Sequence, residues 1–292
     1  MKKKQKKTSF KPRWSILVVA LAMILFGSFL LWQNYQAIKI PIRQLKPEKA
    51  IALKSAEPQI SASPISNHNN LEKFQVPILM YHYIRVADPA DTMGVALSVT
   101  PENFAAQMTW LSQNDYESMK LTDLADPAKT VLHKIEAKNK KPIIITFDDG
   151  YDNAYTQAMP ILKKHDFTGT FFIIRHFVGR PEYATQTQID QMAKASMEIG
   201  SHTLDHKDLA KNSIEVDHQQ IFDSKLDANT FCYPSGRYTE ETVNLVKEAG
   251  YVAAVTTRDG IANQDSSLFE LPRVRIKNVD LETFANRVKG LK

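Results

Sequence analysis

The motif FDDG, residues 147–150, ends an apolar run with two adjacent aspartates, Asp148 and Asp149, and a glycine. Adjacent carboxylates repel each other, so each must find water, a hydrogen-bond donor or a cation. A divalent ion would neutralise one aspartate, and the other could take a proton from a water molecule whose pKa the ion lowers to about 7. The glycine would let the backbone turn sharply enough to aim both side chains inward. Alone, the motif is more typical of a turn, because Asp and Gly suit turn geometry.

A second motif, SHTLDH at residues 201–206, places His202 and His206 four positions apart. Two imidazoles in one local turn can bind a single ion, and a carboxylate from a neighbouring strand would complete a two-histidine, one-carboxylate face with open positions. Alone, such a pair is more often two surface histidines. His82 in the motif MYH and Ser235 in the motif CYPSG also follow short apolar runs. Together, these motifs favour a metal site that carries out acid–base chemistry.

Eight short apolar runs are candidate strands, at residues 76–81, 118–121, 142–147, 170–174, 197–200, 230–233, 251–256 and 271–276. Helical patterns lie between them: Thr100 can cap a helix whose first residue is Pro101, and another helix begins at Thr239 and ends at Gly250. Alternating strands and helices, with strands apolar on both faces, predict a parallel sheet. About 215 residues of this pattern fit one α/β barrel, in which functional residues gather at the carboxyl ends of the strands.

The N-terminal part predicts a membrane anchor. Residues 1–14, the predicted cytoplasmic segment, contain seven Lys and Arg and so carry a charge of +7. Because the whole chain has a net charge of +5, the remainder is slightly acidic, and no nucleic-acid partner is expected. The uncharged run 15–32 would form a helix about 27 Å long, close to the thickness of a bilayer core. The one-sided lysines orient the N-terminus inside and everything else outside. The alternative is a cleavable signal peptide, which usually has a shorter apolar region and an A-x-A-like cleavage site.

Residues 33–75 are polar, contain four prolines and no glycine, and predict a tether that would reach about 35 Å as a coil. Residues 76–292 would then form an extracellular catalytic domain. The single cysteine, Cys232, excludes an internal disulfide, favours a Gram-positive cell surface and is expected to be a small buried apolar residue. We therefore expect a single-pass protein of the cell membrane, and a monomer.

The motifs TFDDG, SHTLDH and YPSG resemble the first three motifs of the polysaccharide deacetylases, carbohydrate esterase family four. The resemblance covers residues 76–278, and its first two motifs together are highly specific. It implies a distorted (β/α) barrel of seven or eight parallel strands and the metal-dependent removal of acetyl groups from N-acetylated sugars. It is nearest to the exported deacetylases of poly-N-acetylglucosamine and peptidoglycan, so the implied partner is such a polysaccharide.

The resemblance also implies roles for individual residues. Asp148 would be the general base, and Asp149, His202 and His206 would hold zinc or a similar divalent ion. Water on the ion would attack the acetamide carbon, while the ion and a backbone N–H, that of Ser235, hold the oxyanion. A protonated histidine would then give its proton to the departing sugar amine.

Two departures from the family pattern affect these roles. Members with the usual third motif have an arginine where this chain has Cys232, and Arg273 at the end of the last strand is our candidate to hold the base in its place. A surface charge or a salt bridge elsewhere is the alternative for Arg273. The usual late leucine-x-histidine motif is missing, because no histidine follows His218. In the branch with permuted motifs, MYH can fill that role, so we predict His82 as the general acid, against a packed core histidine.

The remaining candidates have ordinary alternatives. Ser235 stands where an aromatic residue is usual, which should change the sugar-facing wall more than the chemistry. Tyr233 and Tyr238 could stack on sugar or could simply pack. Solvated or structural roles are expected for five histidines: His68, His133, His165, His176 and His218. The alternative functions are a hydrolase of another amide or ester and a carbohydrate-binding module that has lost catalysis.

Overall fold

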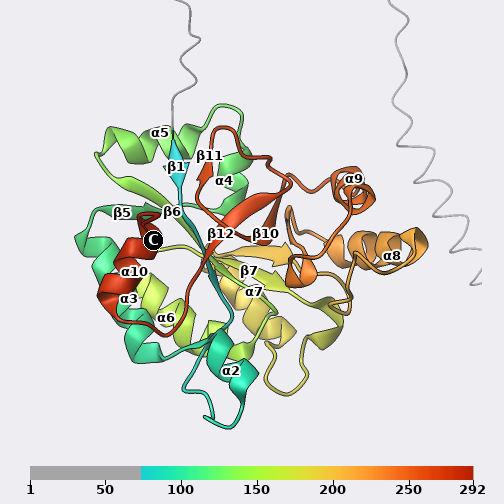
Figure 1. Cartoon of the computed structure of the whole chain (residues 1–292), viewed down its shortest axis with the longest axis horizontal. Helices are drawn as coiled ribbons and strands as arrows, with labels where there is room; N and C mark the ends of the chain where they lie inside the picture. Colours follow the sequence, from blue (N-terminus) through green and yellow to red (C-terminus); the bar gives the residue numbers. More distant parts are fainter. Residues whose placement is uncertain (1–73, 292) are drawn as a thin grey trace, which may run out of the picture. The chain divides into compact units, whose positions relative to one another are not determined.

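Seven parallel strands close into a barrel in the part of the chain that the computed structural model describes, residues 74–291 (Figure 1). Around the ring the order is β2-β12-β10-β9-β8-β7-β6, and β6 pairs again with β2. The strands are β2 (Ile78–Tyr81), β6 (Lys141–Phe147), β7 (Thr170–Ile173), β8 (Glu198–Ser201), β9 (Thr230–Cys232), β10 (Ala253–Asp259) and β12 (Leu271–Arg275). The predicted barrel is confirmed for this part of the chain.

Five shorter strands lie outside the ring. β5 (Tyr116–Ser118) pairs in parallel with the first residues of β6. Two small ladders are formed by β1 (Gln75–Val76) with β11 (Ala262–Asn263) and by β3 (Tyr83–Ile84) with β4 (Ser98–Val99). The second ladder begins directly after His82, so it anchors the chain just beyond that residue.

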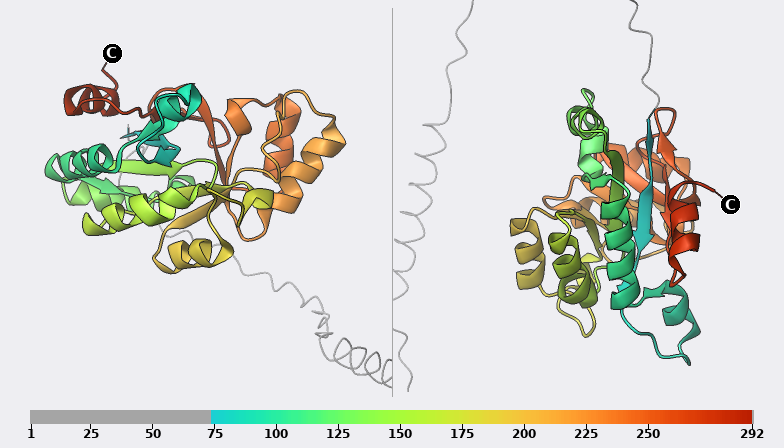
Figure 2. Two further views of the ribbon diagram at one scale, coloured as in Figure 1. Left: turned by 90° about the horizontal axis from the view of Figure 1, so that it is seen from below. Right: turned by 90° about the vertical axis from the view of Figure 1, so that its left-hand side faces the viewer.

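Helices surround the barrel (Figure 2). They are α2 (Thr92–Leu97), α3 (Pro101–Gln113), α4 (Leu121–Ala125), α5 (Thr130–Ala137), α6 (Met159–Lys164), α7 (Gln186–Lys194), α8 (Ile214–Lys225), α9 (Glu240–Glu248) and α10 (Leu281–Val288). The π-helical turn Ala154–Ala158 precedes α6, and 3-10 turns follow β7 (Arg175–Phe177) and β9 (Pro234–Gly236). The caps of two helices match the prediction: the side chains of Thr100 and Thr239 each accept a hydrogen bond from a backbone N–H of the helix that follows.

Side chains alternate between the inside of the barrel and the outer layer of helices, as the pleat of a strand requires. On β6, Ile144 belongs to the cluster that fills the barrel, whereas Ile143, Ile145 and Phe147 belong to the cluster packed against the outer helices. Continuing this alternation beyond Ile144 places Thr146 and then Asp148 on the inner side. The strand therefore delivers polar groups to the barrel axis only at its carboxyl end.

Four details differ from the sequence-based prediction. The strand predicted at 251–256 lies later in the chain, as β10 at Ala253–Asp259. The run 76–81 is broken at Pro77, which has no N–H to donate, into β1 and β2. The predicted strand 118–121 was placed too late, because β5 ends at Ser118 and Leu121 is the first residue of α4. The two-residue strands β3, β4 and β11 were not predicted, since so few residues carry no periodic signal.

Within residues 74–291, no helix has the length and apolar character needed to cross a membrane. The predicted anchor at 15–32 and most of the predicted tether at 33–75 lie outside the described residues. Both therefore stay predictions.

Candidate metal and acid–base site

The polar motifs meet at one end of the barrel, where the strands β2, β6, β8, β9 and β12 finish. Their backbones adopt conformations that L-residues seldom use. Asp149 has φ 71° and is followed by Gly150 with φ 79°, and His206 and Ser235 have φ 58° and 53°. Strain of this kind is concentrated at functional sites, where the surrounding fold holds it in place. At Asp149 and Gly150 it produces the sharp turn that aims both aspartates into the barrel mouth.

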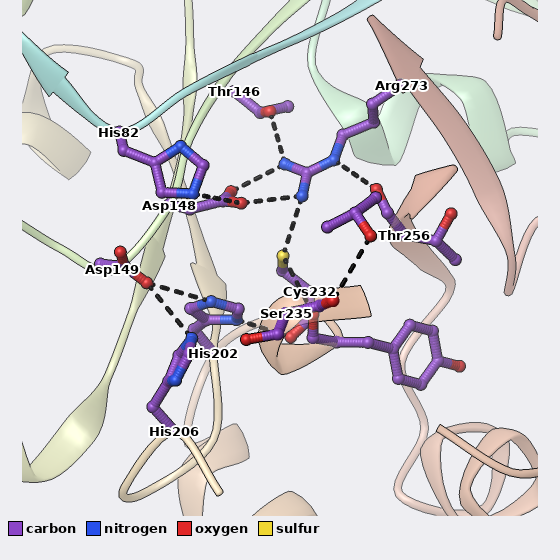
Figure 3. Close-up of polar contacts among 12 residues, drawn as sticks. His82, Thr146, Asp148, Asp149, His202, His206, Cys232, Ser235, Thr256 and Arg273 are labelled. Atoms are coloured by element: carbon purple, nitrogen blue, oxygen red, sulfur yellow. Dashed lines mark hydrogen bonds and ion pairs between the residues drawn. The ribbon is translucent and has the colours of Figure 1, made fainter. Parts of the chain in front are cut away.

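The three predicted ligands, Asp149, His202 and His206, come together around one point (Figure 3). The Nε2 atoms of His202 and His206 lie 3.3 Å and 3.5 Å from Oδ1 of Asp149. One ligand atom from each of the three residues falls within 4.8 Å of the others. The carboxylate comes from the turn after β6 and the imidazoles from the loop after β8, so two strand ends build the cluster.

The donor set fits a divalent ion. Oδ1 of Asp149 is buried, and neither imidazole is aligned to donate to it, so it has no hydrogen-bond partner within residues 74–291. Nδ1 of His202 lies 2.7 Å from the carbonyl oxygen of Cys232, so this nitrogen carries a hydrogen and Nε2 is the atom that faces Asp149. Burial acts against a charge on His202, but Cys232 and Asp149 outweigh it and raise the pKa of His202 well above its ordinary value, so a metal ion would take the place of the proton on Nε2. A buried carboxylate oxygen and two imidazole nitrogens that face it form a donor set that a divalent cation would satisfy.

Asp148 is held by a buried arginine. Arg273 is fully buried, and its guanidinium donates to both carboxylate oxygens of Asp148 at 2.7 Å and 2.8 Å. It also donates to the carbonyl of Thr256 at 2.7 Å and to the hydroxyl of Thr146 at 3.0 Å. This is the contact expected for Arg273, and its burial excludes the alternative of a surface charge.

The two aspartates are both ionised in this environment. Burial alone would raise the pKa of Asp148, but Arg273 outweighs burial and holds that pKa well below its ordinary value. Burial also acts against ionisation of Asp149, and His202 outweighs it, so the pKa of Asp149 is lowered too. Burial lowers the pKa of His206 and His202 adds to the effect, which favours the neutral imidazole that can bind a metal.

His82 reaches the site from the end of β2. Its Nε2 lies 3.8 Å from Oδ2 of Asp148, and 14% of its side chain is exposed. Burial lowers the pKa of His82, and the carboxylates of Asp148 and Asp149 oppose that lowering. The segment is fixed on both sides, because Asp148 donates its N–H to the carbonyl of Tyr81 and Ile84 donates to the side chain of Asn153. His82 is therefore held beside Asp148 with part of its side chain exposed.

Ser235 lies in the turn after β9, next to the residues that hold His202 in place. The turn is closed by a hydrogen bond from the N–H of Gly236 to the carbonyl of Tyr233. A side chain at Gly236 would collide with Thr257, so glycine is required where the chain passes this close. The close-up shows Ser235 beside Cys232 and His202 (Figure 3).

Sequence reasoning missed four contacts of the site. Cys232 is buried as predicted, but its carbonyl orients His202 and its Sγ accepts from Nη2 of Arg273 at 3.3 Å. Thr146 and the carbonyl of Thr256 also hold Arg273. Only Thr146 had a signal in the sequence, because it lies two residues before Asp148 and so shares its face of β6.

Tyr233, Tyr238 and three of the remaining histidines have partners outside the proposed ligand cluster. Tyr233 is fully buried, stacks on Tyr238 and donates its hydroxyl to the carbonyl of Phe269, so it packs and offers no ring to a sugar. His176 pairs with Asp205 on the surface. The ring of His165 lies near that of Phe167, and the ring of His218 stacks on Phe222. His68 lies outside the described residues.

Comparison with known proteins gives consistent matches. The family model named polysaccharide deacetylase matches residues 135–254. A Bacillus subtilis protein, YxkH, which is named as a polysaccharide deacetylase, is 34% identical over 242 residues, 80% of this chain and 81% of that protein. The poly-beta-1,6-N-acetyl-D-glucosamine N-deacetylase of Staphylococcus epidermidis is 25% identical and spans 84% of this chain and 98% of its own. The solved structure of the Streptococcus pyogenes deacetylase PplD in complex with acetate matches with a TM-score of 0.64 and 30% identity, over 73% of this chain and 98% of that one.

Proposed function

Because the chain belongs to the polysaccharide deacetylase family, whose members are hydrolases acting on amides, we propose that it removes acetyl groups from an N-acetylglucosamine-containing wall polysaccharide or exopolysaccharide. We propose further that Asp149, His202 and His206 hold a divalent ion, and that this ion is zinc. The observation that carries the proposal is the cluster itself: a buried carboxylate oxygen without a donor faces two imidazole nitrogens, beside a second aspartate fixed by a buried arginine. The names of the staphylococcal relatives support the choice of polymer.

When bound, the ion would polarise the acetyl carbonyl and lower the pKa of a water molecule to about 7. Asp148 would take the proton of the attacking water. Arg273 keeps that carboxylate ionised and fixes its orientation, and each oxygen retains a lone pair beyond the one that Arg273 occupies. Because its pKa is lowered, Asp148 is a weak base. The proton transfer would therefore depend on the acidity that the ion gives to the attacking water molecule.

Two further roles are part of this proposal. The backbone N–H of Ser235 would face the carbonyl oxygen as negative charge develops on it. His82, at the open side of Asp148, would donate its proton to the sugar nitrogen as the C–N bond breaks, because a free amine anion is a very poor leaving group. The products would be acetate and a glucosamine residue in the polymer. The predicted anchor at 15–32 and tether at 33–75 support our further proposal that this happens at the outer face of a Gram-positive cell membrane.

The test is acetate release from a substrate panel: N-acetylchitooligosaccharides, peptidoglycan and β-1,6-linked poly-N-acetylglucosamine, each with and without a chelator. We expect release from at least one polymer, its loss with chelator and its loss in Asp148→Asn. Activity that survives in Asp148→Asn would remove the proposed base. Activity that ignores the chelator would remove the proposed ion.

A further inference from the structure

A cleft of about 410 Å³ opens at the barrel mouth between the ends of β10 and β12 and the helix α10. Its charged lining residues are Asp259, Arg275, Lys277 and Arg287. Asp259 and Arg287 pair with each other at 2.6 Å. The side chains of Arg275 and Lys277 have no hydrogen-bond or ion-pair partner within residues 74–291. The cleft therefore carries two uncompensated positive charges.

Each wall of this cleft contains a residue that lies next to a residue of the proposed catalytic site. Arg273 and Arg275 are two residues apart on β12, so they share the inner face, and Arg275 lies one step nearer the mouth. It is close enough to His82 to add to the lowering of that pKa, which burial chiefly causes. On the opposite wall, the hydroxyl of Thr257 donates to the carbonyl of Ser235 at 3.4 Å. A group bound in the cleft would therefore adjoin the sugar whose acetamide is hydrolysed.

The positive charges of Arg275 and Lys277 favour the binding of an anion. Arg275 is partly exposed and Lys277 is exposed, so both positive groups are accessible to a ligand that enters the cleft. Lys277, two residues further along the chain, would repel Arg275 rather than compensate it. The planar fork of Arg275 matches the paired oxygens of phosphate or carboxylate, and Lys277 adds a mobile point charge.

We propose that this cleft is a subsite for an anionic group, a phosphate or a carboxylate, that the polysaccharide carries close to the acetylated sugar. The inference rests on the proposed function and narrows it: the preferred substrate is an acidic N-acetylated glycan rather than a neutral one. The subsite contributes to the binding of the polymer. Any effect of Arg275 on His82 acts on charged and neutral substrates alike, so the ratio of their rates reports on the subsite alone.

The first experiment compares kcat/KM for three N-acetylglucosamine oligosaccharides of equal length: one neutral, one with a phosphate monoester and one with a lactyl carboxylate. The wild type should prefer a charged substrate, and the better of the two identifies the anion. Replacing both cations, Arg275→Gln with Lys277→Gln, should lower the charged-to-neutral ratio about tenfold, the worth of a charge-assisted hydrogen bond in a half-exposed site, mainly through KM. The preference should also weaken as salt is raised.

The matched control removes the same net charge elsewhere. Lys163 and Lys164 are exposed in the last turn of α6, which leads back to the start of β7 at the far end of the barrel. The double variant Lys163→Gln with Lys164→Gln should keep the wild-type ratio. An equal fall in this control would mean attraction by overall charge, and equal wild-type rates on charged and neutral substrates would overturn the subsite.

A binding experiment separates this inference from the proposed function. The full chain is titrated with N-acetylglucosamine 6-phosphate and with N-acetylglucosamine, and binding is followed by NMR. The phosphate should bind more tightly to the wild type and lose that advantage in the Arg275 and Lys277 double variant. If no substrate is deacetylated, the proposed function fails and this titration still decides the subsite. An advantage that persists in the double variant would place the anion elsewhere.

Discussion

Replacing Arg273 by glutamine removes the guanidinium that fixes Asp148, and it should reduce stability and activity together. Arg273 is fully buried and forms two hydrogen bonds with Asp148, at 2.7 Å and 2.8 Å, as well as two with Thr146 and Thr256. Breaking a buried pair leaves an uncompensated charge and typically costs about 3–5 kcal/mol. That is a large share of the roughly 5–15 kcal/mol by which a domain is stable.

The pH dependence should change in a defined direction. In the wild type the pKa of Asp148 lies below its ordinary value, so the pair contributes stability above about pH 4 and loses it as the pH falls through the lowered pKa. In Arg273→Gln, the guanidinium no longer opposes the effect of burial, so the pKa of Asp148 rises. The variant should therefore lose stability as the pH rises from the ordinary value towards the raised one. The acidic limb of kcat/KM should move to higher pH, and the rate at neutral pH should fall by roughly 10² to 10⁴.

Urea unfolding between pH 5 and 8 measures the change in stability, and the pH profile of kcat/KM measures the shift of the acidic limb. Arg273→Lys keeps the charge without the fork and should fall between the wild type and Arg273→Gln. Lys138→Gln is the control, because it breaks the exposed pair of Lys138 with Glu117 and should cost less than about 1 kcal/mol. If Arg273→Gln unfolds like the control and its acidic limb stays in place, Arg273 does not hold the base.

Three further predictions concern the neighbouring groups. His82→Ala should keep its bound metal, measured by elemental analysis, and lose roughly 10² to 10⁴ in kcat, whereas full activity would move the acid role to another residue. Zinc at about 100 times its dissociation constant should stabilise chelator-treated enzyme by about 2.7 kcal/mol, and Asp149→Asn or His206→Ala should lose most of this gain in thermal unfolding. Iodoacetamide should leave activity unchanged, because Cys232 is fully buried and burial raises the pKa of its thiol; rapid inactivation would show that the barrel opens.

Those parts of the site that lie in one stretch of chain could be predicted from the sequence. FDDG and SHTLDH each hold their chemical groups within a few residues, so the local turn alone fixes their relation. The carboxyl ends of the five strands that carry the site, β2, β6, β8, β9 and β12, could also be predicted to within one residue, because runs apolar on both faces are typical of a parallel barrel. The position of Arg273 followed from the same rule, since it lies near the end of the last strand.

Contacts that depend on how strands are aligned could not be predicted. β10 and β12 pair with a register shift between Val255 and Asp259, so the level at which Thr256 meets Arg273 is not a matter of counting residues. The carbonyl of Cys232 is a backbone group, and any residue at that position would provide it. The pairing of β5 outside the ring likewise depends on space beside β6 that only the folded barrel defines.

The interior of the barrel explains why an arginine on β12 can hold an aspartate on β6. In the ring, only β2 separates the two strands, and both direct their inner side chains to the same layer. Position 232 on β9 faces that layer from the other side, because Sγ of Cys232 lies 3.3 Å from Nη2 of Arg273. The space beside Asp148 therefore holds one guanidinium, which could be supplied from β12 or from position 232 on β9. A large side chain at position 232 would compete with Arg273 for it, so the small cysteine and the arginine on the last strand form one arrangement that neither residue explains alone.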